Sequence, residues 1–270
     1  MSGKIQTVPA VRRLPGGRNG IDGTAAVHTC ELPLEAALRI PWLRKRLLSW
    51  FEHGGRSFPW RDPDRTPYEV VVAEILLQRT TAAGVARAYA WFIERYPSWT
   101  ALAQAPRECL EHTLRPLGLW RQKALALLHL AQSIAERGGV VPSSRAELER
   151  MRGIGPYTAS AVLAIVYGQA EPLVDVNMTR LLGRFFGSSG DTRGSRQRLL
   201  HARGLRLVSG KRSLEVNRAV LDFGALVCRA RRPLCPECPL RVKCQSFMQA
   251  QLQPTPSAGA LSDSRSAGGR

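Results

Sequence analysis

Four cysteines near the end of the sequence have spacing that can bind a metal, in the pattern Cys228-x6-Cys235-x2-Cys238-x5-Cys244. Soft thiolate ligands select iron–sulfur clusters or zinc. Zinc sites usually repeat a Cys-x2-Cys pair, and this segment contains one such pair. The spacing therefore favours a [4Fe–4S] cluster, with a four-cysteine zinc site as the alternative. The remaining cysteines, Cys30 and Cys109, are solitary, and we expect neither to be a ligand.

A Gly/Pro-rich segment, Met151-Arg152-Gly153-Ile154-Gly155-Pro156-Tyr157, precedes an apolar run. Glycines allow a sharp turn and a close approach to a ligand, and Pro156 suits the first turn of a helix. The free N–H groups at the start of that helix attract anions. The segment can bind a DNA phosphate without a side chain, although an ordinary turn between helices has the same pattern.

Two carboxyl groups occupy positions that suit catalysis. Asp175 is placed to begin a helix, where it can cap the helix or, held ionised by the helix N-terminus, stabilise a developing positive charge. Glu74 has mostly apolar neighbours at helical spacing, among them Val70, Val71 and Leu77. Such surroundings should raise the pKa of its carboxyl group, as suits a proton donor or a base that orients water. A side chain that reaches solvent is the alternative for Glu74.

The elements that must position these residues are predicted to be helices. Strand patterns are nearly absent, so we expect an all-α protein with disordered tails at 1–33 and 249–270. The apolar spacing is helical over 35–53, 68–79, 82–95, 106–114, 121–136, 156–168, 177–186, 196–208 and 213–227.

The charge of the chain indicates its partner. Lys and Arg number 39 against 21 Asp and Glu, which gives a formal net charge of +18. A nucleic acid is the expected partner. No apolar run is long enough for a membrane span, and the start lacks the apolar segment of a signal peptide. We therefore expect an intracellular protein.

Together, the cysteines, the hairpin, Glu74 and Asp175 resemble the helix-hairpin-helix DNA glycosylases, the superfamily of endonuclease III and MutY. The resemblance runs from about Leu43 to Phe247. It implies a two-lobed fold, with a six-helix barrel over 63–172 that contains the hairpin 151–157. An iron–sulfur lobe would combine 34–62 and 173–248. A monomer would bind double-stranded DNA and flip a mismatched or damaged base into a pocket between the lobes.

The resemblance also implies roles for single residues. Asp175 would stabilise the oxocarbenium-like sugar or a covalent sugar intermediate, and Glu74 would protonate the departing base or position water. Gly153 and Gly155 would form the DNA-binding hairpin. Gln78 would fill the space that the flipped base leaves, and Arg79 beside it would also contact DNA.

Position 157 bears on strand cleavage. Bifunctional endonuclease III-type enzymes have a nucleophilic lysine there, whereas this chain has Tyr157 and no lysine between Lys123 and Lys211. We therefore expect a monofunctional glycosylase in which Tyr157 is part of the catalytic site.

The choice of base is less constrained. The segment Glu-Ile-Leu-Leu-Gln-Arg-Thr-Thr from position 74 looks closer to mismatch thymine/uracil glycosylases, and the chain ends soon after Cys244. MutY enzymes continue into a domain that recognises 8-oxoguanine. We expect excision of thymine or uracil opposite guanine. The alternative is excision of adenine, because Pro59-Trp60 and Thr66-Pro67-Tyr68 resemble the corresponding segments of MutY. An alternative of another class is a non-catalytic DNA-binding scaffold.

Overall fold

The computed structural model describes residues 34–187 and 193–252. Every regular element in these residues is helical, which confirms the all-α prediction. The expected tail at 1–33 lies outside the described residues, as does 253–270. The second tail was predicted to begin at 249, and this is wrong, because the last helix continues to Leu252. None of the described helices combines the length and apolar character that a membrane span requires.

Most helices lie close to the ranges that the apolar spacing predicts. They are α1 (Leu34–Gly54), α2 (Pro67–Leu77), α3 (Ala82–Arg95), α5 (Arg107–Leu114), α6 (Trp120–Glu136), α8 (Pro156–Ile165), α9 (Val176–Phe186), α10 (Arg193–Val208) and α11 (Ser213–Leu226).

The sequence pattern missed three short helices and three single turns of 3-10 helix. The short helices are α4 (Trp99–Ala103), α7 (Arg145–Arg150) and α12 (Gln245–Leu252). Two of them begin at serine caps, since Ser98 accepts from the N–H of Ala101 and Ser144 from that of Glu147. The five residues of α4 and the six of α7 are too few for apolar periodicity to be detectable. The single turns are η1 (Pro59–Arg61), η2 (Arg115–Leu117) and η3 (Arg241–Lys243).

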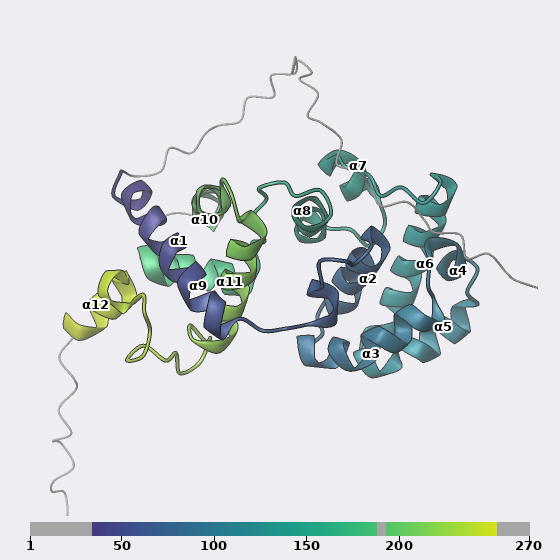
Figure 1. The fold of residues 1–270 in the computed structure, drawn as a ribbon, viewed down its shortest axis with the longest axis horizontal. Helices are drawn as coiled ribbons and strands as arrows, with labels where there is room; N and C mark the ends of the chain where they lie inside the picture. The colour runs from purple at the N-terminus through teal and green to yellow at the C-terminus, as the bar shows by residue number, and fades with distance from the viewer. Residues whose placement is uncertain (1–33, 188–192, 253–270) are drawn as a thin grey trace, which may run out of the picture.

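The helices form two lobes, each with its own hydrophobic core (Figure 1). The barrel lobe contains α2 to α8, and its core runs from Trp60 to Leu163. The cysteine lobe contains α1 and α9 to α12, with a core from Ile40 to Leu240. Trp60, which the predicted boundary assigned to the cysteine lobe, packs in the barrel core instead. Helix α8 lies between the lobes (Figure 1).

Helix α2 is largely buried in the barrel lobe, and nearly all of its side chains are apolar. A capping box fixes its start: the Thr66 side chain accepts from the N–H of Glu69, and Glu69 accepts from the N–H of Thr66 at 2.8 Å. The helix therefore holds its one inward carboxyl group, Glu74, at a defined place.

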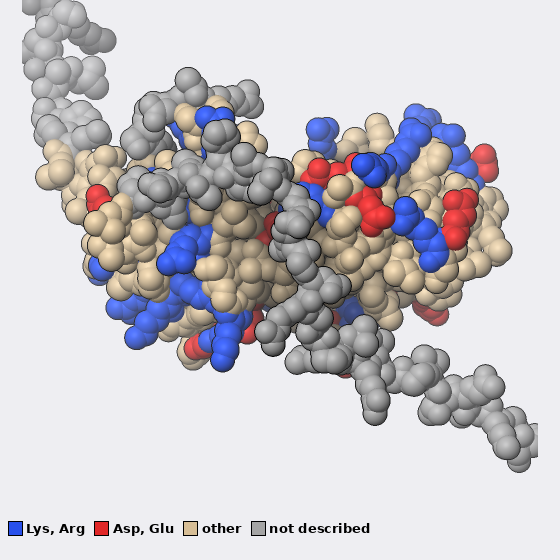
Figure 2. Space-filling model, turned by 90° about the horizontal axis from the view of Figure 1, so that it is seen from above, with Lys and Arg blue, Asp and Glu red and all other residues tan. Residues whose placement is uncertain are grey.

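Basic side chains lie on the surface of both lobes (Figure 2). Figure 2 shows Lys and Arg side chains over each half of the molecule, whereas Asp and Glu gather mainly over the barrel lobe. A surface of this sign is suited to a polyanion.

Candidate active site

A cavity of about 950 Å³ lies at the junction of the two lobes. It brings together the three predicted catalytic residues, Glu74 from α2, Tyr157 from α8 and Asp175 from the start of α9. Gln78 and Arg79 also line the cavity, whereas Gly153 and Gly155 are not among its lining residues. Residues separated by about a hundred positions in the sequence therefore form one site.

Glu74 lies at the buried side of this cavity, with a relative exposure of 8%. Burial raises the pKa of its carboxyl group to about 7, and the positive charge of Arg61 opposes that rise. The predicted raised pKa is thus found, for the predicted reason. Near neutral pH this carboxyl group can either give or take a proton.

Tyr157 is the second residue of α8, and, like Leu221 of α11, it packs against a small apolar cluster that includes Ala161 and Leu173. Burial raises the pKa of its phenol well above the ordinary value, and the charges of Glu74 and Asp175 add to the rise. The phenol therefore stays protonated and lies close to both carboxyl groups. It can donate a hydrogen bond but cannot act as an amine nucleophile.

Asp175 is the N-cap of α9, as the sequence predicts. Its Oδ1 accepts from the N–H groups of Asn177 and Met178, each at 2.8 Å, and its Oδ2 accepts from Asn177 Nδ2 at 2.6 Å. Burial nevertheless raises the pKa of Asp175 above its ordinary value, although these hydrogen bonds act in the opposite direction. Burial therefore opposes the effect that the helix N-terminus alone has on the Asp175 carboxyl group.

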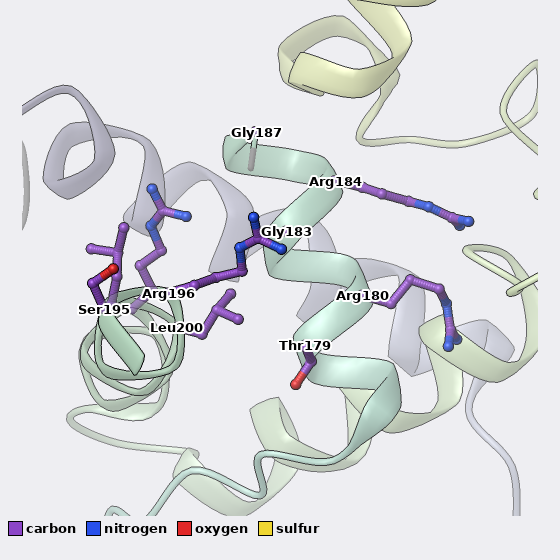
Figure 3. A pocket seen from close by; sticks show the side chains of 10 residues that line it. Thr179, Arg180, Gly183, Arg184, Gly187, Ser195, Arg196 and Leu200 are labelled. Atoms are coloured by element: carbon purple, nitrogen blue, oxygen red, sulfur yellow. The ribbon is translucent and has the colours of Figure 1, made fainter. Parts of the chain in front are cut away.

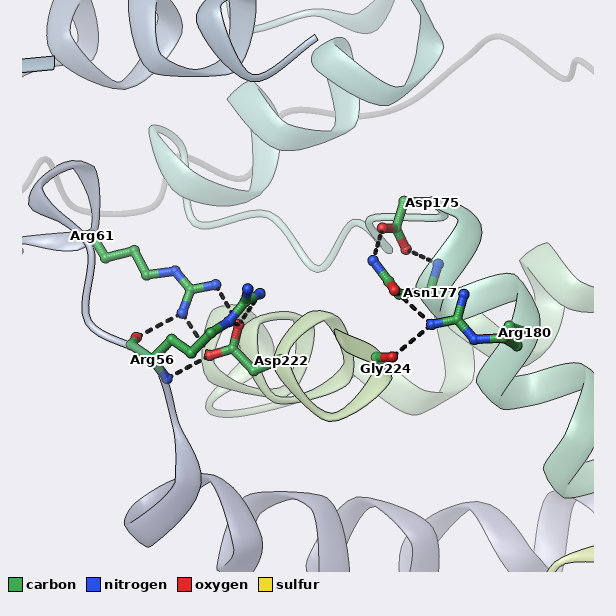
Figure 4. A network of polar contacts seen from close by, with 7 residues as sticks. All are labelled: Arg56, Arg61, Asp175, Asn177, Arg180, Asp222 and Gly224. Atoms are coloured by element: carbon green, nitrogen blue, oxygen red, sulfur yellow. Dashed lines mark hydrogen bonds and ion pairs between the residues drawn. The ribbon is translucent and has the colours of Figure 1, made fainter. Parts of the chain in front are cut away.

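Asn177 connects Asp175 to Arg180 and, through Arg180, to α11 (Figure 4). Its Oδ1 accepts from Arg180 Nη2 at 2.7 Å, and the same nitrogen donates to the Gly224 carbonyl oxygen at 2.6 Å. Arg180 Nε also donates to the carbonyl oxygen of Cys228 at 2.8 Å. The Asp175 carboxylate is therefore oriented by a chain of bonds that ends at the first cysteine of the loop.

The hairpin before α8 needs one of its two glycines for its shape. Gly153 has φ of +91°, and a Cβ there would lie 2.7 Å from the Cβ of Ala126. Gly155 has φ of −94° and open space around it. Gln78 Nε2 donates to the Gly153 carbonyl oxygen at 3.0 Å, so the side chain predicted to contact DNA is tied to the hairpin.

A buried ion-pair network that the sequence analysis missed closes another side of the cavity (Figure 4). Asp222 of α11 is fully buried and accepts from the N–H and Nε of Arg56, each at 2.8 Å. Arg61 donates to both oxygens of the same carboxylate, at 2.8 and 2.9 Å. The available signal was a lone Asp in the apolar run Ala219-Val220-Leu221-Asp222-Phe223.

No lysine is found among the described residues that line the cavity. Lys123, on α6, is buried and donates to the Leu117 carbonyl oxygen at 3.1 Å and to the hydroxyl of Thr80. Burial lowers the pKa of its ammonium group. This amine supports the turn after α2 and does not face Asp175 or Tyr157.

The four predicted cysteine ligands line a cavity of about 440 Å³ in the cysteine lobe, together with apolar side chains such as Leu181, Phe185 and Phe223. Burial raises the pKa of the Cys238 thiol to about 11, and the other three thiols add to the rise. Within the described residues, no three Cys, His, Asp or Glu side chains are close enough to hold a single metal ion. Cys109 is exposed on α5, and Cys30 lies outside the described residues.

A smaller cavity of about 290 Å³ lies between α9 and α10 (Figure 3). Arginines are prominent in its lining, yet Arg180 and Arg184 extend from α9 away from α10 in this view. Arg184 donates to the carbonyl oxygens of Arg229 at 2.7 Å and of Ala230 at 3.1 Å. These guanidinium groups brace the cysteine loop rather than converge on the cavity.

The chain is similar to proteins of known function over most of its length. A model of the HhH-GPD superfamily of base excision DNA repair proteins matches residues 72–203. A thymine-DNA glycosylase from Aeropyrum pernix is 39% identical over 76% of this chain and 94% of its own. An adenine DNA glycosylase from Homo sapiens is 32% identical over 82% of this chain but 42% of its own.

A solved structure supports the same relation. The structure of a thermostable thymine-DNA glycosylase matches with a TM-score of 0.74 and 30% identity, over 78% of this chain and 98% of that one. The two-lobed helical arrangement is therefore shared along nearly the whole length of that protein.

Proposed function

The chain belongs to the HhH-GPD superfamily of base excision DNA repair proteins, and we propose that it is a monofunctional DNA glycosylase that removes thymine or uracil opposite guanine. The observation that carries the proposal is the cavity in which Glu74, Tyr157 and Asp175 meet. Relatives named thymine or thymine/uracil glycosylases match over most of their length, whereas the human adenine glycosylase matches over less than half.

Asp175 acts on the sugar in this mechanism. When the bond between C1′ and the base nitrogen breaks, the electron pair leaves with the base and positive charge develops on the sugar. A carboxylate held at the N-terminus of α9 by the N–H groups of Asn177 and Met178 stabilises that charge without having to reorganise.

Glu74 and Tyr157 act on the water that replaces the base. With a pKa near 7, Glu74 is ionised in part of the population at neutral pH and can accept the proton of the attacking water. Tyr157 supplies a neutral phenol that can orient the water or either carboxylate. Because no lysine reaches the described cavity, hydrolysis stops at the abasic site and leaves the strand intact.

The basic surface binds the DNA backbone, and the hairpin at the start of α8 contacts a phosphate. The target base must be flipped, since its glycosidic bond is inaccessible in the stacked duplex. All three catalytic side chains come from one chain, so a monomer is sufficient.

The test is single-turnover release of bases from duplexes containing T:G, U:G, A:G and A:8-oxoguanine mismatches, with and without alkali. We expect alkali-dependent cleavage at T:G and U:G. Release of adenine alone would replace the proposal with the adenine alternative, and release of no base at low salt would support the DNA-binding scaffold. Strand scission without alkali, or a borohydride-trapped adduct, would contradict the monofunctional assignment.

We also propose that Cys228, Cys235, Cys238 and Cys244 hold a [4Fe–4S] cluster. The uneven spacing and the shared apolar cavity of about 440 Å³ support a cluster of several atoms. When bound, the cluster cross-links the loop that begins at the end of α11. A brown protein with about four irons per chain is expected, and a colourless protein with one zinc per chain would overturn the assignment.

A further inference from the structure

One face of α11 forms a wall of the active cavity, and it carries a single charged side chain. Leu214, Arg218, Leu221 and Ala225 line the cavity and follow helical spacing. Arg218 is half-buried, and Leu221, one turn further along the same face, packs against the apolar cluster on which Tyr157 also packs. Its guanidinium group therefore belongs to the wall that a flipped base would meet.

Arg218 differs from its arginine neighbours because its guanidinium group makes no hydrogen bond or ion pair with any residue in the described part of the chain. Asp222, one turn along the helix, already accepts hydrogen bonds from Arg56 and Arg61. Glu215 pairs with Arg212 at 2.6 Å. Both carboxylates act on Arg218 only through their charge, so its N–H donors have no acceptor among the described residues.

A guanidinium group in a partly buried site is unfavourable when its donors lack acceptors, unless a ligand supplies them. Burial lowers the pKa of Arg218 and repulsion by Arg61 lowers it further, although the charges of Asp222 and Glu215 act in the opposite direction. The Arg61 guanidinium acts on Glu74 as well, and Arg61 and Arg218 both line the cavity. This part of the cavity is electrostatically prepared for negative charge.

We propose that Arg218 donates hydrogen bonds to a carbonyl oxygen of the flipped base and stabilises the negative charge that this base acquires on leaving. As the bond from C1′ to N1 breaks, its electron pair passes to N1 and spreads onto O2 and O4 of the pyrimidine. Water then bonds to C1′ and gives its proton to the Glu74 carboxylate. The inference rests on the proposed pyrimidine glycosylase function and names the residue that selects the base.

The chemistry of a guanidinium group explains the selection. It carries donors only, so it pairs with carbonyl oxygens of thymine or uracil but not with the amino group of adenine. Adenine also leaves most readily after a ring nitrogen gains a proton, and two adjacent cations oppose that protonation. Arg218 and Arg61 therefore favour bases that depart as anions.

The experiment compares the full-length wild type with Arg218→Gln and Arg218→Lys. Single-turnover rates are measured on duplexes with uracil, thymine or 5-fluorouracil opposite guanine. The exposed Arg206 of α10 provides a matched control, because Arg206→Gln removes the same charge outside the cavity. The wild type is assayed first, and failure to release any of these pyrimidines would overturn the proposed function itself.

We expect Arg218→Gln to slow release of uracil and thymine by about 10- to 100-fold, with Arg218→Lys in between. The loss should be smaller for 5-fluorouracil, whose anion is more stable. Arg206→Gln should leave all three rates within about twofold of the wild type. The melting temperature of Arg218→Gln should be no lower than that of the wild type, since the guanidinium group makes no hydrogen bond or ion pair with the described residues.

Two results would overturn the inference while leaving the glycosylase function intact. One is an equal loss for uracil and 5-fluorouracil, or no loss at all. The other is weaker binding of Arg218→Gln to undamaged duplex at unchanged single-turnover rates, which would place the guanidinium group on a phosphate.

Discussion

Asp175 combines a structural and a chemical task in one side chain, because it caps α9 and faces the active cavity. Asn can still accept from the N–H groups of Asn177 and Met178 but carries no charge. We expect Asp175→Asn to fold and bind DNA like the wild type while losing at least about 100-fold in single-turnover rate. Gel-shift titration and base-release assays measure the two quantities. Full activity of this variant would refute the proposed mechanism.

Glu74 makes stability depend on pH through its buried carboxyl group. In the unfolded chain this group loses its proton near its ordinary pKa, whereas in the folded protein it keeps the proton up to a pH of about 7. The free energy of unfolding therefore falls as pH rises through this window, by about 3 kcal/mol in total. Glu74→Gln cannot ionise, so it should remove this decline and melt higher than the wild type at about pH 8. Thermal unfolding across pH tests this, and parallel pH profiles of the two proteins would contradict it.

The rate of base release should depend on pH in the opposite direction, through the same Glu74 carboxyl group. If ionised Glu74 accepts the proton of water, the rate of pyrimidine release rises as pH increases through about 7 and then levels off. Glu74→Gln should lose this rise along with most of the activity. A wild-type rate that falls over the same range would instead identify Glu74 as the proton donor.

At the level of elements, the start of α8 depends on one glycine for its shape. Gly153→Ala would place a methyl group 2.7 Å from the Ala126 Cβ at a φ of +91°, so the hairpin must shift. We expect a loss of about 1–3 kcal/mol in stability and weaker DNA binding. Gly155→Ala is the matched control for stability, because its φ of −94° and open surroundings accept a side chain. Equal melting temperatures for the two variants would exclude this role of Gly153.

The helices differ in how well their own sequence specifies them. Long amphipathic or uniformly apolar runs such as α3 and α8 were predicted to within a few residues, since their periodicity is visible locally. Helices α4 and α7 were missed because five or six residues contain too little periodicity, and their serine caps resemble ordinary turns. Helix α12 packs against α9, a contact that no local pattern encodes.

Across the whole molecule, Asp222 joins α11 of the cysteine lobe to the segment that leads into the barrel lobe, through Arg56 and Arg61. Although burial raises the pKa of Asp222, the hydrogen bonds from Arg61 and Arg56 lower it more, so the carboxylate is ionised. Asp222→Asn leaves two guanidinium groups without their counter-ion and should cost about 3–5 kcal/mol. The exposed pair of Glu52 and Arg212 is the control, since Glu52→Gln should cost less than about 1 kcal/mol. Chemical denaturation measures both variants, and similar losses would argue against a buried anchor.

The net charge of +18 predicts how the protein binds DNA of any sequence. Each phosphate contact releases counter-ions, so affinity for undamaged duplex should fall by at least about tenfold between roughly 50 and 200 mM salt. Fluorescence anisotropy at several salt concentrations gives the slope. Affinity that does not change with salt would show that phosphate contacts contribute little.

The sequence alone was sufficient to predict the all-α class, the grouping of the four cysteines, the helix cap at Asp175 and the raised pKa of Glu74. Each of these features depends mainly on residues that are close together in the chain. Packing of the two lobes decided the rest. It placed Tyr157 between two carboxyl groups and paired Asp222 with arginines over 160 residues away. It also left Arg218 lining the cavity without a hydrogen-bond partner among the described residues. Such long-range pairings depend on where helices meet in space, and burial then sets the charge of each group.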